Sequence, residues 1–124
     1  MIGLKDVSSQ SRSGLANKLQ QELNQLPGRP LAIYVDESGK IAGAGSMIAT
    51  MKAYVIYDDS QSNKGNIVYT EVSAQTRNKL ANKIQDAMQS IGSEKFIAVY
   101  NDEGGKLAGG GLLALGKAYI FYYA

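Results

Sequence analysis

Two glycine-rich segments, each preceded by a lysine, have the residue types that most directly suggest chemistry. Their residues are Lys40, Gly43, Gly45, Lys106, Gly109, Gly110 and Gly111. Glycine lets the main chain approach a ligand closely, and successive exposed N–H groups can bind an anion. A neighbouring lysine would add positive charge, so the segments predict a site for a phosphorylated or nucleotide-like molecule. Tight packing of a strand against a helix, or of one unit on the other, explains the same glycines without a ligand.

Two arginines could provide a further contact to an anion. Arg12 and Arg77 each lie three residues before the first apolar residue of a predicted helix, on or beside the stripe that should be buried. A guanidinium in that position needs a partner. The partner is either a phosphate or carboxylate of a ligand, or a carboxylate of the protein itself. The internal candidates are Asp36, Glu37, Asp102 and Glu103.

Lysines and tyrosines on two predicted strands complete the candidate ligand-binding residues. They are Lys52, Tyr54, Lys117 and Tyr119. The lysines could reach an anion from the strand edge, and the tyrosine rings could stack on a base. Alternatively, the lysines protect a sheet edge from unwanted strand pairing, and the tyrosines form part of a core or an interface.

The absence of histidine and cysteine excludes several kinds of active site. A Ser-His-Asp triad, a Cys-His pair and a zinc site built on His or Cys cannot form. The carboxylate pairs Asp36-Glu37 and Asp102-Glu103 could hold Mg²⁺ or act as acid and base. Turns are rich in Asp and Glu for reasons of solvation alone. We therefore predict no metal, no cofactor and no catalytic residue.

Composition places the chain among soluble globular proteins. Of its 124 residues 44% are hydrophobic and 19% are charged, with a formal net charge of +2. The charges are spread over both halves, so a nucleic-acid polymer is not an expected partner. The first residues lack the pattern of a signal peptide, and no segment approaches the roughly 18 apolar residues of a membrane span. These features predict a cytoplasmic protein that does not associate with membranes.

A repeat runs along the chain and predicts its architecture. Residues 36–45 read DESGKIAGAG and residues 102–111 read DEGGKLAGGG. The match extends at an offset of 65 residues, with one inserted residue near Ile97 and one lost residue near Met51. We interpret it as a tandem duplication within a single domain of residues 1–124, made of units 1–58 and 66–124 and a linker at 59–65. Two such units are expected to pair about a pseudo-twofold axis.

Each unit is predicted to have the element order βαβββ. Apolar residues at helical spacing (Leu15, Leu19, Leu23 and Leu26; Leu80, Ile84, Met88 and Ile91) predict two helices of about 18 residues. Ser8 and Ser73 are the expected N-caps, and Pro27-Gly28 and Gly92 the expected ends. Strands are expected at 2–7, 30–36, 41–47 and 52–58, and at 66–72, 95–102, 107–113 and 117–123. The extra residue near Ile97 is expected to form a β-bulge.

Two βαβββ units in a chain of this length resemble the vicinal-oxygen-chelate architecture of glyoxalases and bleomycin-resistance proteins. Those enzymes use His and Glu as metal ligands, and this chain has no His. The resemblance therefore implies an order of elements and transfers no functional residue.

The sequence thus predicts an α+β protein with two helices packed on antiparallel or mixed sheets. The first functional hypothesis is a non-enzymatic protein that sequesters or senses a small anionic ligand, of the phosphorylated or nucleotide-like class. The alternative is a structural or interaction protein that forms a homo-oligomer or binds a protein partner. A homo-oligomer is expected in either case, and a carboxylate-based enzyme is the third hypothesis.

Overall fold

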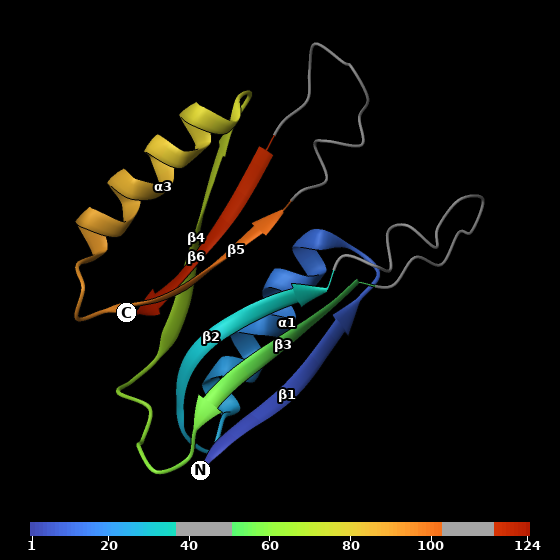
Figure 1. The fold of residues 1–124 in the computed structure, drawn as a ribbon, viewed down its shortest axis with the longest axis vertical. Helices are drawn as coiled ribbons and strands as arrows, with labels where there is room; N and C mark the ends of the chain where they lie inside the picture. Colours follow the sequence, from blue (N-terminus) through green and yellow to red (C-terminus); the bar gives the residue numbers. More distant parts are fainter. Residues whose placement is uncertain (37–50, 103–115) are drawn as a thin grey trace. The chain divides into compact units, whose positions relative to one another are not determined.

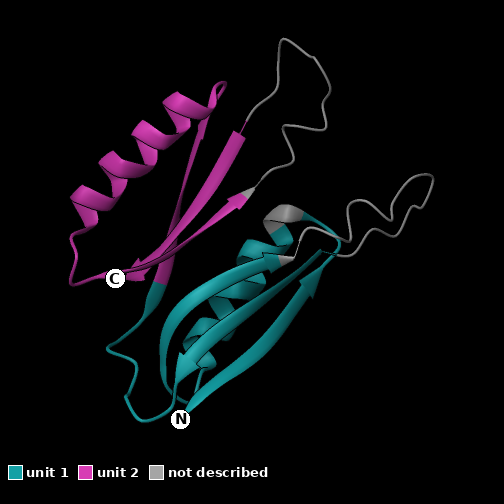
Figure 2. Ribbon diagram, in the orientation of Figure 1, with its two compact units in different colours: residues 1–67 teal, residues 68–124 magenta. Residues whose placement is uncertain are grey.

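A computed structural model describes residues 1–36, 51–102 and 116–124 of the chain (Figure 1). The strands expected at 41–47 and 107–113, and the turns before them, lie outside these ranges. Over the described residues the protein is α+β, with two helices and two three-stranded antiparallel sheets. The chain divides into two compact units, Met1–Ile67 (unit 1) and Val68–Ala124 (unit 2), which are coloured separately in Figure 2.

Unit 1 has the order strand, helix, strand, strand over its described residues. Its elements are β1 (Ile2–Ser9), α1 (Arg12–Gln25), β2 (Arg29–Asp36) and β3 (Met51–Asp58). Strand β3 lies between β1 and β2 and pairs antiparallel with both. Figure 1 shows α1 along one face of this sheet. Since successive side chains of a strand point to opposite faces, half of each strand faces α1 and half faces away.

The face of the sheet beneath α1 forms the core of unit 1. Its buried residues are Val7, Ala53 and Val55 from the strands and Leu15, Leu19 and Leu23 from the helix. On the same face, Lys5 forms an ion pair with Glu22 of α1 at 3.1 Å. The tip of the Tyr57 ring lies over Gly3, so a side chain at position 3 would require this ring to move.

Unit 2 has the same order of described elements. They are β4 (Ile67–Ala74), α3 (Arg77–Ile91), β5 (Phe96–Asp102) and β6 (Gly116–Tyr123), and β6 is the central strand. The first residue of β4, Ile67, belongs to unit 1. Beneath α3, a small core consists of Ala74, Leu80 and Ala118, with Val72, Ile84 and Val99 packed against it.

Aromatic side chains gather on the sheet of unit 2. The rings of Tyr100 and Tyr119 stack with their centroids 5.3 Å apart. The ring centroid of Tyr69 lies 5.6 Å from that of Tyr119 and 5.5 Å from that of Phe121. Tyr100, Tyr119 and Phe121 are buried.

The helix caps differ from the expected ones. Ser8 and Ser73 were expected to be N-caps, but β1 and β4 continue past them and the caps are Ser11 and Thr76. The carbonyls of Ser8 and Ser73 instead accept hydrogen bonds from Lys18 and Lys83. The helices therefore have 14 and 15 residues rather than about 18.

The helix ends follow the expected breaks. Gly92 ends α3 with φ of 91°, a conformation that side-chain-bearing residues rarely adopt, and its N–H donates to the carbonyl of Met88. Helix α1 ends at Gln25, just before Pro27-Gly28. A cap pattern thus locates the end of a helix well when a glycine or proline marks it, and its start less well when several hydroxyl residues compete.

A β-bulge is present near Ile97, as expected, but it does not account for the extra residue. The register of β5 on β6 shifts between Phe96 and Ala98, and that of β2 on β3 shifts between Pro30 and Ala32. Both units therefore have a bulge. Three residues separate α1 from β2, whereas four, from Gly92 to Lys95, separate α3 from β5. The inserted residue consequently lies in the connection after the helix.

The segment after β3 is attached to α1 by side-chain amides. Asn24 accepts a hydrogen bond from the N–H of Ile67 at 2.8 Å and donates one to its carbonyl at 2.9 Å. Asn63 donates to the carbonyl of Leu23 at 3.1 Å. Earlier in the segment, the Ser60 hydroxyl donates to Asp58 and lowers the pKa of that carboxyl. The two bonds from Asn24 satisfy the N–H and the carbonyl of Ile67, a fully buried residue whose main-chain groups would otherwise lack partners.

Candidate functional site

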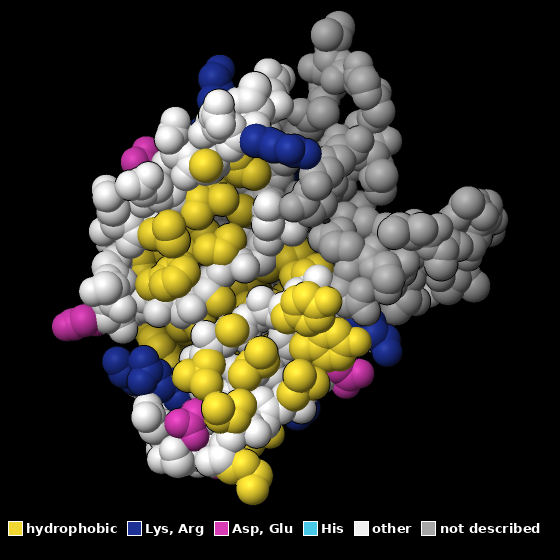
Figure 3. Space-filling view, viewed as in Figure 1, with side chains coloured by type: hydrophobic (Ala, Val, Ile, Leu, Met, Phe, Trp, Pro, Cys, Tyr) yellow, Lys and Arg dark blue, Asp and Glu magenta, His cyan; other side chains and the backbone are white. Residues whose placement is uncertain are grey.

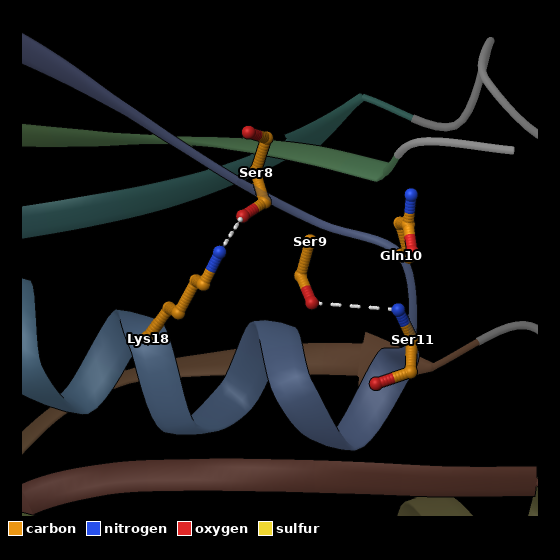
Figure 4. Close-up of a pocket in the computed structure, with 5 residues that line it drawn as sticks. All are labelled: Ser8, Ser9, Gln10, Ser11 and Lys18. Atoms are coloured by element: carbon orange, nitrogen blue, oxygen red, sulfur yellow. Dashed lines mark hydrogen bonds between the residues drawn. The ribbon is translucent and has the colours of Figure 1, made fainter. Parts of the chain in front are cut away.

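A polar hollow lies where β1 ends and α1 begins (Figure 4). It is lined by Ser8, Ser9, Gln10, Ser11 and Lys18 and has a volume of about 630 Å³. Four of the five residues are exposed and Ser9 is half-buried, so the hollow is open to water.

Hydrogen bonds fix several polar groups of the hollow. Lys18 Nζ donates to the carbonyl of Ser8 at 3.0 Å, and Ser11 Oγ accepts from the N–H of Gly14 at 3.0 Å. The N–H of Ser11 donates to Ser9 Oγ at 3.4 Å. An ammonium has three donors, so Lys18 can bind a further acceptor. The hydroxyls and this cation suit a polar or anionic ligand.

Most of the predicted glycine and lysine site residues lie outside the described part of the chain. These are Lys40, Gly43, Gly45, Lys106, Gly109, Gly110 and Gly111. Arg12 is the first residue of α1, and its side chain is also outside the description. Arg77 is the first residue of α3 and is exposed, so it does not lie within the buried stripe, and its role as a ligand-binding residue stays a prediction. Water can solvate this guanidinium, which therefore needs no buried partner.

The two predicted strand lysines occupy equivalent register positions in their sheets. Lys52 is opposite Asp36 on β2, and Lys117 is opposite Asp102 on β5. Lys117 also forms an ion pair with Glu71 at 3.4 Å, between side chains that are 39% and 45% exposed. Such a surface pair contributes about 0–1 kcal/mol, so it leaves this lysine available to exchange partners.

The two predicted tyrosines lie in matched places but differ in exposure. Tyr119 is only 2% exposed, and its ring faces Tyr100 and Tyr69. A ring buried in this way has no free surface on which a base could stack. Tyr54 stacks on Tyr34 at 5.7 Å, and Tyr34 is 61% exposed.

Large apolar residues are exposed on the sheet of unit 1, on the face opposite α1. Ile2 is 68% exposed and Leu4 is 61% exposed. Leu4 is opposite Ile56 in register, and the stacked pair of Tyr34 and Tyr54 follows on the same face. We call this set, Ile2, Leu4, Tyr34, Tyr54 and Ile56, the apolar sheet face. Figure 3 shows hydrophobic side chains gathered over this sheet.

The apolar sheet face is absent from the expectations above, although β1 contains a signal for it. Ile2 and Leu4 point to one side of the strand and Val7 to the other, because side chains alternate. A strand with one face in water should have apolar residues on a single side. Apolar residues on both sides of β1 therefore indicate that both faces are to be covered.

Within residues 1–36, 51–102 and 116–124, no three carboxylate side chains gather where they could hold a metal ion. No helix among the described residues is long and apolar enough to span a membrane.

Comparison with known proteins identifies no relative of this chain. No family model, no curated protein and no solved structure matches the chain.

Proposed function

We propose that this protein is a self-assembling structural protein that forms homo-oligomers through the apolar sheet face of unit 1. The observation that carries the proposal is the exposure of Ile2 and Leu4 on β1 and of Tyr34 on β2, on one face of the sheet, with Ile56 and Tyr54 of β3 between them. Single exposed apolar residues are common on soluble proteins. A contiguous group on one face is typical of an interaction surface, because water contact there has a free-energy cost that association removes.

The proposal that the two units are a tandem duplication has several supports. Each unit has the same order of described elements, the same strand order and a bulge near the start of its second strand. Lys18 and Lys83, which are 65 residues apart, donate to the carbonyls of Ser8 and Ser73, also 65 residues apart. Ser11 and Thr76 cap their helices in the same way. The pseudo-twofold arrangement of the units stays a prediction.

The duplication makes a second copy of the chain the expected partner. At offsets of 65 or 66, the apolar sheet face corresponds to the residues Ile67, Tyr69, Tyr100, Tyr119 and Phe121 of the second repeat. Of these Ile67, Tyr100, Tyr119 and Phe121 are buried. The same face is thus apolar in both repeats and is buried only in the second. We infer that association of chains buries it in the first.

Replacement of Leu4 by Asp tests the proposal. We expect sedimentation velocity over a range of concentrations to show a wild-type oligomer, and Leu4→Asp to weaken self-association at least tenfold, because a carboxylate is poorly tolerated in an apolar interface. Leu4 is exposed, so the fold should persist, as far-UV circular dichroism would show. Gln21→Asp, at an exposed position of α1 where the second repeat has Asp86, is the matched control. A wild-type protein that stays monomeric at all concentrations would contradict the proposal.

A second candidate function is binding of a small anionic ligand, without catalysis, in the hollow beside Lys18. Its support is the set of hydroxyls and the ammonium that line this hollow. We expect inorganic phosphate or a nucleoside monophosphate to shift the amide resonances of Ser9 and Ser11, and Lys18→Ala to weaken that binding about tenfold. Lys83→Ala is the control, since Lys83 makes the same carbonyl contact in unit 2. Absence of shifts at millimolar phosphate would exclude this candidate.

A further inference from the structure

We propose that the assembly is head-to-tail: the apolar sheet face of one copy is covered by α3 of the next copy. The inference rests on the proposed self-assembly and identifies the second surface. Two features of unit 1 support it, a buried side of α1 and a contact between Asn24 and Ile67. The residues at the matched positions elsewhere in the chain are exposed or half-buried.

The first observation concerns the two helices. Ala16 of α1 is fully buried, whereas its counterpart on α3, Ala81, is exposed. Likewise Leu19 is fully buried and its counterpart Ile84 is only half-buried. The identical motif LANK occupies positions 15–18 and 80–83, so composition does not explain the difference. Helix α3 therefore has an uncovered side at a position where α1 is buried.

The second observation concerns the contact between α1 and the following strand. Asn24 bonds both main-chain groups of Ile67, the first residue of β4, and Ile67 is fully buried. The counterparts of these two residues are Gln89 on α3 and Ile2, the first residue of β1. Gln89 has the same amide as Asn24 and is exposed, and Ile2 is 68% exposed. Both halves of a second such contact are thus present and accessible.

The main chain of Ile2 is correctly oriented for this contact. The carbonyl of Met1 accepts a hydrogen bond from the N–H of Asp59 at 3.0 Å. In an antiparallel pair, residues that bond across the strands alternate with residues that do not. Ile2 is the next residue after Met1, so its N–H and carbonyl point away from β3. Because β1 is an edge strand, no other described strand pairs with them.

These two surfaces are different, so the association is heterologous. Contacts of this kind repeat from copy to copy and form a ring, or an open filament if the rotation does not close. Gln89 would bond the main chain of Ile2 while the exposed side of α3 around Ala81 covers Leu4 and Tyr34. This accounts for both exposed surfaces with one type of interface.

Complementary variants test the direction of assembly. Leu4→Asp disables the sheet face and leaves α3 intact, whereas Ala81→Arg disables α3 and leaves the sheet face intact. We expect each variant alone to be at least tenfold weaker in self-association than wild type, and an equimolar mixture to form a one-to-one dimer. The dimer forms because α3 of the Leu4→Asp chain can cover the intact sheet face of the Ala81→Arg chain. Native mass spectrometry, with one chain isotope-labelled, identifies it.

The matched control for Ala81→Arg is Asn82→Arg. Asn82 is the next exposed residue of α3, and its counterpart Asn17 is exposed on α1, so this position lies outside the expected interface. Asn82→Arg should assemble as wild type does. If Ala81→Arg also assembles normally while Leu4→Asp does not, the sheet faces pair with each other; head-to-tail assembly is then wrong and the proposed function stands. A mixture that stays monomeric contradicts the inference in the same way.

Discussion

We expect Leu19→Ala to lower the free energy of unfolding by about 2–5 kcal/mol, the usual cost of deleting a buried leucine. Leu19 is fully buried in the core between α1 and its sheet. The loss has two parts, which are the transfer of the removed carbons and the cavity that they leave. Chemical denaturation followed by far-UV circular dichroism measures it.

The counterpart in the other unit is a matched comparison for that variant. Ile84 has the same number of side-chain carbons as Leu19 but is only half-buried, packed against the core of Ala74, Leu80 and Ala118. Ile84→Ala should therefore cost about 1–2 kcal/mol, since the transfer free energy scales with the apolar area removed from water. Equal losses at the two positions would mean that the two helices are buried to the same extent, contrary to the structure.

We expect Asn24→Leu to destabilise the protein by about 2–4 kcal/mol, because two main-chain groups lose their partners together. The side chains are similar in size, so the change removes hydrogen bonds with little change in volume. The N–H and carbonyl of Ile67 both depend on the Asn24 amide. An unsatisfied buried polar group costs about 1–3 kcal/mol. The midpoint and slope of urea denaturation measure the loss.

The adjacent residue Gln25 is the control for this variant. It is the last residue of α1 and is exposed, so Gln25→Leu should change the free energy of unfolding by less than about 0.5 kcal/mol. Protection of the Ile67 amide from hydrogen exchange is a second measurement. It should fall in Asn24→Leu and stay unchanged in Gln25→Leu; unchanged protection in both would show that the amide contact is not formed.

Much of the described fold could be predicted because the signals are local. The spacing of Leu15, Leu19 and Leu23 predicts α1, and the β-branched and aromatic runs predict the six strands, with bounds within two residues of those observed. The predicted N-cap of α1 was wrong because Ser8, Ser9 and Ser11 can all cap a helix. The length of β1 decides which of these serines precedes the helix. That length depends on pairing with β3, which is distant in the sequence.

The candidate site was less predictable than the elements. Tyr54 and Tyr119 occupy matched places in the two proposed repeats, yet one ring lies beside an exposed tyrosine and the other is buried. Arg77 is expected on or beside the buried stripe, and its side chain is exposed. Residue type and spacing describe what a side chain could do, but whether it meets water or protein depends on residues from other elements.

The order of the described elements and the apolar side of each helix follow from the amino-acid sequence alone, because each depends on residues close together in the chain. Which matched positions are covered depends on the folded arrangement of the chain. Ala16 and Ala81 lie in the same motif and differ completely in burial, as do Ile67 and Ile2. Burial is a property of the space around a residue rather than of the residue, so identical segments acquire different roles once the chain has folded.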